Sequence, residues 1–488
     1  MLDLKENDNL DANSNRGLVL PRAMLDSLTI TGGNTNLATT VRNASGVWDI
    51  QEHIGLALYN VNKSDACIGG ADEGVYVWDG EKWLDLWSNK PIRPVLGSGT
   101  DQYQGANTYI VMKGQSVSVP VKRAFQIWNE YGGGTPDEST GHVLPNPTSY
   151  FTNYTTGILT VDIIWQEAFD ATASDVLVSA PIAVNQLSPI EESTFTIVAG
   201  SKEGNALVAL KIDGQVIWQW QIWVPSSDPT ATAYGYNTGS SVYWFMDRYL
   251  GAVSTEKQKW DGAQNGNGGS SPALRNAHGL YYQWGRPTPF KKFGESTDFQ
   301  NADPANVPLN FLTAISSHLF IRSTSGEGGN TPIGNTVTMD WYSNTPQYWG
   351  TRWGDGTTDD TGNKTAFDPC PVGWRIPAWK NNVSPWNCLA NSDQKLDFAT
   401  YGGYDFTELG RILGYYPASG YRARSTSYLY DIGNNVSIWA ATPSAPGASN
   451  EGGRRLYFSA PNPPNTAIFP ESNHRMANGL SVRCVQDN

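Results

Sequence analysis

Apolar and polar residues alternate in short runs along the first half of the chain. The run VYVWDGEKWLDLW, residues 75–87, places Asp79-Gly80 between two such stretches, and an Asp-Gly pair readily adopts the positive φ of a hairpin loop. TYIVMKGQSVSVPV, residues 108–121, and GILTVDIIW, residues 157–165, predict further strands. No helix of ten or more residues is expected before about residue 270. The first part is therefore predicted to be mainly β and to form a sandwich.

A second hairpin is predicted in NALVALKIDGQVIWQWQIWVP, residues 205–225, with its turn at Asp213-Gly214. Alternate residues of a strand share a face, and one face of the outgoing strand carries Trp218, Trp220, Ile222 and Val224. A row of this kind serves either as a platform for sugars or as core. The alternation of tryptophan with aliphatic residues favours core.

The pattern breaks at SSDPTATAYGYNTGSS, residues 226–241, which predicts a domain boundary near residues 225–240. We expect a flexible arm over residues 1–25, a β-sandwich over residues 26–225 ending in the tryptophan-rich hairpin, and a second domain of α+β type over residues 226–488. In this second domain SPALRNAHGLYYQWG, residues 271–285, predicts a short helix. Four of its residues would share one side: Leu274, Ala277, His278 and Tyr281. IPAWKNNVSPWNCLA, residues 376–390, is a weaker helix candidate.

The composition indicates an exported protein. Charged residues make up only 16% of the 488 positions, whereas the chain has 50 Gly, 19 Trp and 23 Tyr, as is common in exported β-proteins and sugar-binding surfaces. The net charge of −13 repels phosphate backbones, so no nucleic-acid partner is expected. No apolar run of about 18 residues is present that could span a membrane. The polar start MLDLKENDNLDANSNRG has no apolar signal core, so either the protein is cytoplasmic or a leader has been removed, and the composition favours the second.

Several motifs of the second half occur in an order that resembles a known family. The chain resembles the Fibrobacter succinogenes major paralogous domain, a C-type-lectin-like module of Bacteroidetes surface proteins. The motifs are FMDRYLGA (245–252), GLYYQWGRPTPF (279–290), PCPVGWRIP (369–377), LGYYPASGYR (413–422), SIWAATPS (437–444), RRLYFS (454–459) and NGLSVRCV (478–485). Residues 203–224 resemble the strand pair that commonly precedes this module. Residues 26–200 resemble a fimbrillin β-sandwich of transthyretin-like type, the building block of Bacteroidetes pili.

The resemblance implies how the cysteines are used. C-type-lectin-like domains bring their two ends together as neighbouring strands, and a bond between Cys370 and Cys484 would close such a domain. Pairing of Cys370 with Cys388 is the rival, because four cysteines allow more than one connectivity. Cys67 is expected to be a free, partly buried thiol. Residues Gly373-Trp374-Arg375 are then expected to be structural: a turn glycine, a core indole and an arginine held by acceptors.

One long loop holds the candidate ligand contacts. Its acidic stretch WGDGTTDDTGN offers oxygen ligands for a candidate calcium site, although a solvated turn is the simpler interpretation. These candidates are Asp355, Asp359, Asp360 and Asn363. Aromatic side chains flank the stretch, and exposed aromatic rings stack on sugars and anchor protein interfaces. They are Trp341, Tyr342, Tyr348, Trp349 and Trp353. Alternatively, some of them pack the loop itself.

The sequence favours a binding protein over an enzyme. The 5 histidines are scattered, and no zinc, nucleophile-elbow, Walker or dinucleotide motif is present. The formylglycine-generating enzymes share the lectin-like fold, but they need a reactive cysteine pair where a structural bridge is expected here. No catalytic residue and no cofactor other than the candidate calcium is predicted. A glycosidase is not excluded, because its two carboxylates follow no spacing rule.

The resemblance implies a cell-surface or pilus-associated adhesin, a tip or minor fimbrillin, whose lectin-like domain binds a glycan or protein ligand. A removed leader or lipid anchor would hold it at the outer membrane. Other pilin subunits would be its partners by strand exchange, after proteolysis at Arg16 or Arg22 in the N-terminal arm. The alternatives are a surface glycan-binding lipoprotein of a polysaccharide-uptake system, and an enzyme on the formylglycine-generating scaffold.

Overall fold

The computed structural model of the chain is mainly β, as predicted. Its longest strands are ten residues, and no helix among the described residues is long and apolar enough to cross a membrane. The structure describes residues 20–28, 30, 34–61, 74–88, 103–133, 144–168, 177–231, 234–237, 242–257, 276–292, 301–302, 312, 318–321, 352–354, 364–389, 402–406, 413–444, 452–459 and 468–487.

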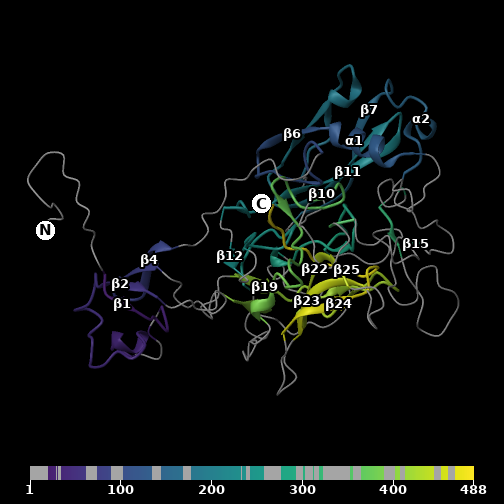
Figure 1. The fold of residues 1–488 in the computed structure, drawn as a ribbon. Helices are drawn as coiled ribbons and strands as arrows, with labels where there is room; N and C mark the ends of the chain where they lie inside the picture. Colours follow the sequence, from purple (N-terminus) through teal and green to yellow (C-terminus); the bar gives the residue numbers. More distant parts are fainter. Residues whose placement is uncertain are drawn as a thin grey trace, which may run out of the picture. The chain divides into compact units, whose positions relative to one another are not determined.

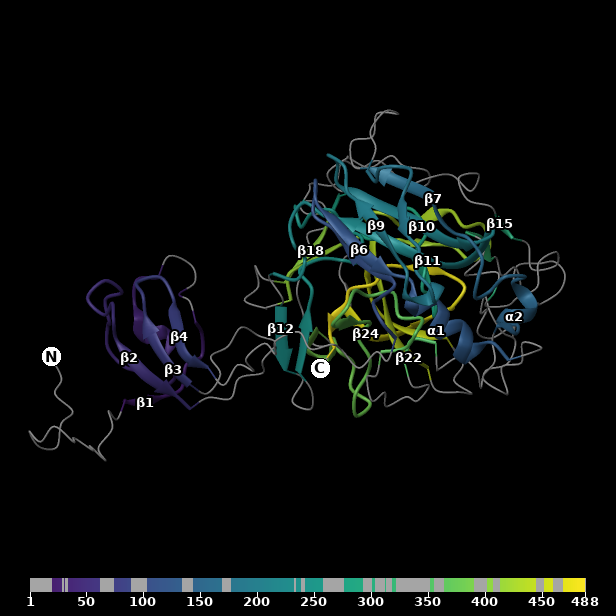
Figure 2. The ribbon, with the colours of Figure 1, turned by 90° about the horizontal axis from the view of Figure 1, so that it is seen from above.

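The described residues form two compact units, one within residues 1–93 and the other within residues 94–407 and 413–488. Figures 1 and 2 show the first unit in purple and the second from blue to yellow. The expected boundary near residues 225–240 is therefore wrong: one hydrophobic core includes Trp128 and Trp220 from before it and Trp284 and Trp439 from after it. A turn-rich segment interrupts the strand pattern there without separating two cores.

The first unit contains a four-stranded sheet in the order β1-β2-β3-β4. Its strands are β1 (Arg22–Ala23), β2 (Ala57–Asn60), β3 (Gly74–Trp78) and β4 (Trp83–Ser88), and it also contains a 3-10 helix, η1 (Leu37–Thr40). The hairpin predicted at Asp79-Gly80 is present, with Gly80 at φ 105° and Trp78 paired with Trp83. The two indoles pack edge to face in the core of this unit, 5.7 Å apart.

The second unit begins with two sheets that share a core. One has the order β5-β11-β10-β7 and the other β6-β9-β8. Phe195 of β9 lies 5.4 Å from Trp220 of β11, ring centroid to ring centroid, so the sheets are in contact. The strands are β5 (Thr108–Ile110), β6 (Ser116–Pro120), β7 (Leu159–Ala168), β8 (Ala183–Asn185), β9 (Thr194–Val198), β10 (Gly204–Ile212) and β11 (Gln215–Val224).

The second predicted hairpin joins β10 and β11. Ile212 pairs with Gln215 across a two-residue loop in which Asp213 and Gly214 have φ of 46° and 86°, as a tight hairpin turn requires. The tryptophan row of β11 is core, as the alternation indicated: Trp218, Trp220 and Trp223 are fully buried. Their burial leaves no tryptophan platform for sugars on this strand.

A helix of ten residues, α1 (Lys122–Tyr131), contradicts the expectation that none occurs before residue 270. Its apolar residues recur at helical spacing, and Phe125 and Trp128 are buried in the core. The short helices α2 (Pro147–Tyr150) and η3 (Ile190–Glu192) lie in the same part of the chain.

The remaining elements are short strands that pair over long sequence separations. They form sheets β12-β13-β26-β17, β14-β25-β20-β21 and β22-β23-β24, and the pairs β15-β16 and β18-β19. Their bounds are β12 (Tyr234–Asn237), β13 (Val242–Phe245), β14 (Tyr282–Gln283), β15 (Asn301–Ala302), β16 (Phe320–Ile321), β17 (Trp374–Arg375), β18 (Gly403–Asp405), β19 (Tyr415–Pro417), β20 (Tyr421–Arg422), β21 (Leu429–Tyr430), β22 (Asn435–Pro443), β23 (Gly453–Ser459), β24 (Ile468–His474), β25 (Gly479–Leu480) and β26 (Val485–Gln486).

Among the described residues, the two helices predicted in this part do not extend over their predicted ranges. Within residues 271–285, the chain leaves the helical conformation after Ala277, and Tyr282 pairs with Leu480 as β14. In the second candidate, Asn381 and Asn382 adopt positive φ in a tight turn, and only the 3-10 helix η5 (Asn387–Leu389) follows. Strand pairing and turn geometry override the helical spacing at both positions.

A buried amide connects the first sheets of the second unit to its C-terminal part. Asn107 donates through Nδ2 to the carbonyls of Ala366 and Asp368, both at 2.8 Å. Its Oδ1 accepts from Trp218 Nε1 at 3.0 Å and from Arg123 Nε at 3.1 Å. Residues 103–231 therefore pack directly behind the turn that carries Cys370, and both views draw these sheets above the C-terminal strands of the unit (Figures 1 and 2).

Candidate functional site

The start and the end of the C-terminal part meet in one sheet. Phe245 of β13 and Arg375 of β17 both pair with Val485 of β26. Cys370 is bonded to Cys484, 114 positions later, so the predicted pairing is present and its rival with Cys388 is not. In the chain-entropy model, closing a loop of this length stabilises the fold by about 4–5 kcal/mol. We call this assembly of β13, β17, β26 and the disulfide the clasp.

A buried lysine supports the turn of the clasp. The Nζ of Lys364 donates to the carbonyl oxygens of Cys370, Pro371 and Trp374, each at 2.8 Å. Three acceptors match the three N–H groups of an ammonium, so the charge is compensated by backbone dipoles. Gly373, at φ 73°, gives the turn the left-handed residue that a side chain would strain.

Asp368 fixes the same turn from the other side. Its carboxylate accepts the backbone N–H of Cys370 and of Ile376, both at 2.8 Å. Burial raises the pKa of Asp368 to about 6, against the opposing effects of Lys364 and the two N–H groups. Arg375 pairs with Asp487 at 3.5 Å, as an arginine held by an acceptor. All these groups are buried, which agrees with the structural role predicted for residues 373–375.

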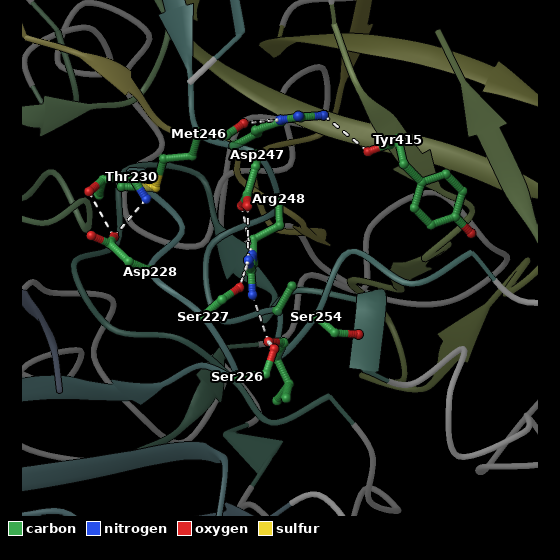
Figure 3. A network of polar contacts seen from close by, with 12 residues as sticks. Ser226, Ser227, Asp228, Thr230, Met246, Asp247, Arg248, Ser254 and Tyr415 are labelled. Carbon is green, nitrogen blue, oxygen red and sulfur yellow. Dashed lines mark hydrogen bonds and ion pairs between the residues drawn. The ribbon is translucent and has the colours of Figure 1, made fainter. Parts of the chain in front are cut away.

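A second buried network ties the segment after β11 to the clasp (Figure 3). Arg248 forms an ion pair with Asp247, with Nε 2.7 Å from Oδ1, and donates to the carbonyl of Val253 and the hydroxyl of Ser227. Close by, Arg483 donates to the carbonyls of Met246 and Tyr415. These arginines bind groups of the protein itself, which indicates a structural network.

The aromatic residues predicted to contact a ligand are mostly outside the described residues: Trp341, Tyr342, Tyr348 and Trp349. Trp353 is described and is only 1% exposed, so the prediction is wrong for this residue. Its ring packs 5.5 Å from that of Trp284, and its Nε1 donates to the carbonyl of Phe367 at 3.1 Å. Trp353 packs the core instead of lining a surface.

The candidate calcium ligands Asp355, Asp359, Asp360 and Asn363 also lie outside the described residues, as do Cys67 and the side chain of Cys388. Within the part of the chain that the structure describes, no group of three or more His, Cys, Asp or Glu side chains could hold a metal ion. The calcium site at residues 355–363 therefore stays a prediction.

Of the two predicted processing sites, Arg16 lies outside the described residues. Arg22 is exposed, but it belongs to β1, which pairs parallel with β2, and its guanidinium lies 5.8 Å from the ring centre of Tyr59. The expected arm over residues 1–25 is thus too long at its end, because Leu25 is fully buried in the core of the first unit.

Two histidines of the second unit are neutral because of their surroundings. Burial, with help from neighbouring arginines, holds the pKa of His318 and of His474 well below the usual value of 6.5. His278 is fully buried, in agreement with a packing role. His53 stacks on Trp48 in the first unit, 6.0 Å away.

Two aromatic pairs on two C-terminal sheets are partly open to solvent, and the sequence did not single them out. Tyr457 of β23 and Phe469 of β24 are cross-strand partners whose rings lie 6.0 Å apart at 25°. Tyr421 of β20 and Tyr430 of β21 form a second pair, 6.0 Å apart at 24°. His474, on the same strand as Phe469, lies 5.4 Å from Tyr421 and links the pairs. We call these four aromatic residues the aromatic face (β22–β24 are yellow in Figure 1).

This face is partly open to solvent. Phe469 is 49% exposed and Tyr430 is 39% exposed, whereas Leu456 and Phe458 on the opposite face of β23 are buried. Comparison of the chain with protein-family models, with curated proteins and with solved structures finds no match. Function is therefore inferred from the residues and geometry of the chain.

Proposed function

We propose that the chain is an adhesin of Bacteroidetes type, displayed on the cell surface or on a pilus as a tip or minor fimbrillin. Its C-terminal part is a C-type-lectin-like domain that binds a glycan or protein ligand, and fimbrillin-type sheets precede it. The observation that carries the proposal is the clasp. A strand near the start of this part, β13, lies beside its last strand, β26, and a disulfide seals the junction, which is the arrangement that the motif resemblance implies.

The disulfide also supports an extracellular location. Disulfides persist in oxidising compartments and are rare in a reducing cytosol. The bond between Cys370 and Cys484 is fully buried, and it closes a part of the chain whose strands are mostly two to four residues long. A domain with so little regular structure gains from a covalent tie. A removed leader or lipid anchor, as the resemblance implies, completes the proposed localisation.

The proposed partners are other pilin subunits that exchange strands. β1 is two residues long, lies at the edge of its sheet, and presents Arg22 to solvent. Cleavage after Arg16 or Arg22 would release the segment before or within β1 and open the edge of β2, which a strand from a neighbour could then occupy. Limited digestion with trypsin should then convert monomer to oligomer in size-exclusion chromatography, and the double variant Arg16→Gln, Arg22→Gln should stay monomeric.

Binding is tested with the full chain on arrays of glycans and of extracellular-matrix proteins. Dose-dependent binding to one class of ligand, lost after reduction of the disulfide, supports the adhesin. Absence of any binding, together with turnover of a hydrolase or oxidase substrate panel, would contradict it.

A further inference from the structure

Arg455 of β23 lies beside the aromatic face, and its charge is compensated in an unusual way. The side chain is only 9% exposed. Its Nε donates to the hydroxyl of Ser472 at 3.2 Å and its Nη1 to the hydroxyl of Ser437 at 3.0 Å. The guanidinium lies 4.3 Å from the ring centre of Tyr457. No carboxylate in the described part of the chain forms an ion pair with it.

Four other buried arginines of this unit differ from Arg455 in their acceptors. Arg248 and Arg375 each pair with a carboxylate. Arg422 and Arg483 donate to backbone carbonyls. Hydroxyl groups are neutral acceptors and each keeps a donor of its own, so they compensate a cation less well than carbonyl or carboxylate groups do.

A buried cation without a counter-ion is costly, and proteins generally pair it. Burial lowers the pKa of Arg455 to about 10, and the nearby hydroxyls of Tyr457 and Tyr421 oppose this effect. The group therefore stays charged at neutral pH. Arg455 lies in the same sheet as the exposed ring of Phe469, which suggests that the missing anion comes from outside the chain.

The surroundings are cationic although the whole chain has a net charge of −13. After burial, the charges of Arg455, Arg475 and Arg424 are the causes that depress the pKa of His474, so three guanidinium groups lie close to this ring. Asp431 lies near Tyr421 and accepts from the amide of Asn435 at 3.1 Å. An acidic ligand repelled by most of the surface would be attracted here.

We propose that the aromatic face, with Arg455 beside it, binds a sugar that carries a carboxylate group. The guanidinium pairs with the carboxylate, and the rings of Tyr457, Phe469, Tyr421 and Tyr430 contact the apolar side of the sugar. A planar guanidinium is suited to bidentate pairing with a carboxylate, and aromatic rings beside it favour a sugar over a free anion. This inference rests on the proposed adhesin function and names the ligand class that it would recognise.

The experiment is a calorimetric or NMR titration of the full chain with D-glucuronate and, as its neutral counterpart, D-glucose. Glucuronate should bind at least about tenfold more tightly than glucose, and added salt should weaken it. Arg455→Gln should abolish this preference, and Arg455→Lys should keep part of it. Acetate should bind more weakly than glucuronate; equal binding would overturn the role of the aromatic rings and with it the sugar.

Two further variants keep the test decisive. Arg454→Gln is the matched control: Arg454 neighbours Arg455 in sequence but lies 3.8 Å from Trp379 on the other face of the strand, so binding should not change. Phe469→Ala removes an exposed ring and should weaken binding of glucuronate even if Arg455→Gln fails to fold. Equal affinity for glucose and glucuronate, or unchanged affinity in Phe469→Ala, overturns the inference. Binding of neutral glycans on the array would then still support the adhesin, whereas no binding of any kind would contradict both.

Discussion

Single residues of the second unit show three ways of stabilising a buried cation. Lys364 is surrounded by three backbone carbonyls, Arg375 faces the carboxylate of Asp487, and Arg455 has only serine hydroxyls and an aromatic ring. The first two arrangements are complete within the chain and belong to the clasp. Only the third would gain from an external anion, which is why we assign recognition to Arg455 and structure to the others.

The role of Lys364 predicts a large loss of stability in Lys364→Met. The variant keeps the length of the side chain but leaves three buried carbonyl groups without their donor, at roughly 1–3 kcal/mol for each group that water cannot reach. We expect the free energy of unfolding in urea to fall by about 3 kcal/mol or more. The control is Lys113→Met, which removes a solvent-exposed ion pair with Glu203 and should cost less than about 1 kcal/mol. Equal effects of the two variants would refute a structural role for the ammonium.

Asp368 predicts a dependence of stability on pH. Its pKa is raised to about 6 in the folded chain, against about 3.9 in an unfolded one. The protonated carboxyl of Asp368 therefore stabilises the folded chain. This stabilisation is fully present below about pH 4 and is lost as pH rises through about 6, which lowers the free energy of unfolding by roughly 2–3 kcal/mol. The stability difference between the parent chain and Asp368→Asn should change by this amount between pH 4 and pH 7, measured by urea denaturation at each pH. A difference that is constant with pH would contradict the raised pKa.

At the residue scale, the motif resemblance implied a turn glycine at Gly373, a core indole at Trp374 and a bond between Cys370 and Cys484, and all three are present. Burial of Trp353 could not be predicted, because it depends on Trp284, which is far away in sequence. Arg455 was not singled out for the same reason: its lack of a counter-ion depends on the residues that β22 and β24 place around it.

At the element scale, the hairpins were predictable and the long-range pairs were not. Gly80 in the first turn, and both Asp213 and Gly214 in the second, adopt the positive φ that such turns require, which is a property of adjacent residues. The segment of residues 271–285 has helical spacing, yet Tyr282 pairs with Leu480 almost two hundred positions later. The helix α1 was missed although Phe125 and Trp128 follow helical spacing, because the strand-like run that ends at residue 121 dominated the pattern.

The connection between β5, β11 and the clasp predicts that Asn107→Ala is strongly destabilising. The substitution removes four buried hydrogen bonds at once: the donors to the carbonyls of Ala366 and Asp368 and the acceptor of Trp218 Nε1 and Arg123 Nε. The carbonyl of Ala366 keeps its bond from Arg123 Nη2. We expect a loss of about 3 kcal/mol or more in urea denaturation. Asn153→Ala, which removes an exposed hydrogen bond to Asp213, is the control and should change stability by less than about 1 kcal/mol. An effect of Asn107→Ala as small as that of the control would mean that the two regions are weakly coupled.

At the scale of the whole molecule, the division into two compact units does not follow the break in the sequence pattern. The turn-rich segment of residues 226–241 suggested a boundary, but Trp223 donates to the carbonyl of Ala252 at 3.0 Å and the hydroxyl of Tyr282 donates to Gln221. Hydrogen bonds and core packing thus cross the segment. The mainly β class follows from alternation along short runs, whereas the division into units depends on which runs share a core.

This shared core predicts how fragments of the chain behave. Residues 94–488 should fold without the first unit, because their core draws no residue from it. Residues 226–488 alone should not, because this fragment lacks Asn107 and Trp223, which bind the carbonyls of Ala366 and Ala252 in the buried core. We expect a cooperative thermal transition and protected amide hydrogens for the longer fragment, and neither for the shorter one, even with the disulfide formed. Circular dichroism and hydrogen exchange on both fragments distinguish the outcomes. Native-like protection in residues 226–488 would show that this part is an independent domain, and the boundary near residue 225 would then be right after all.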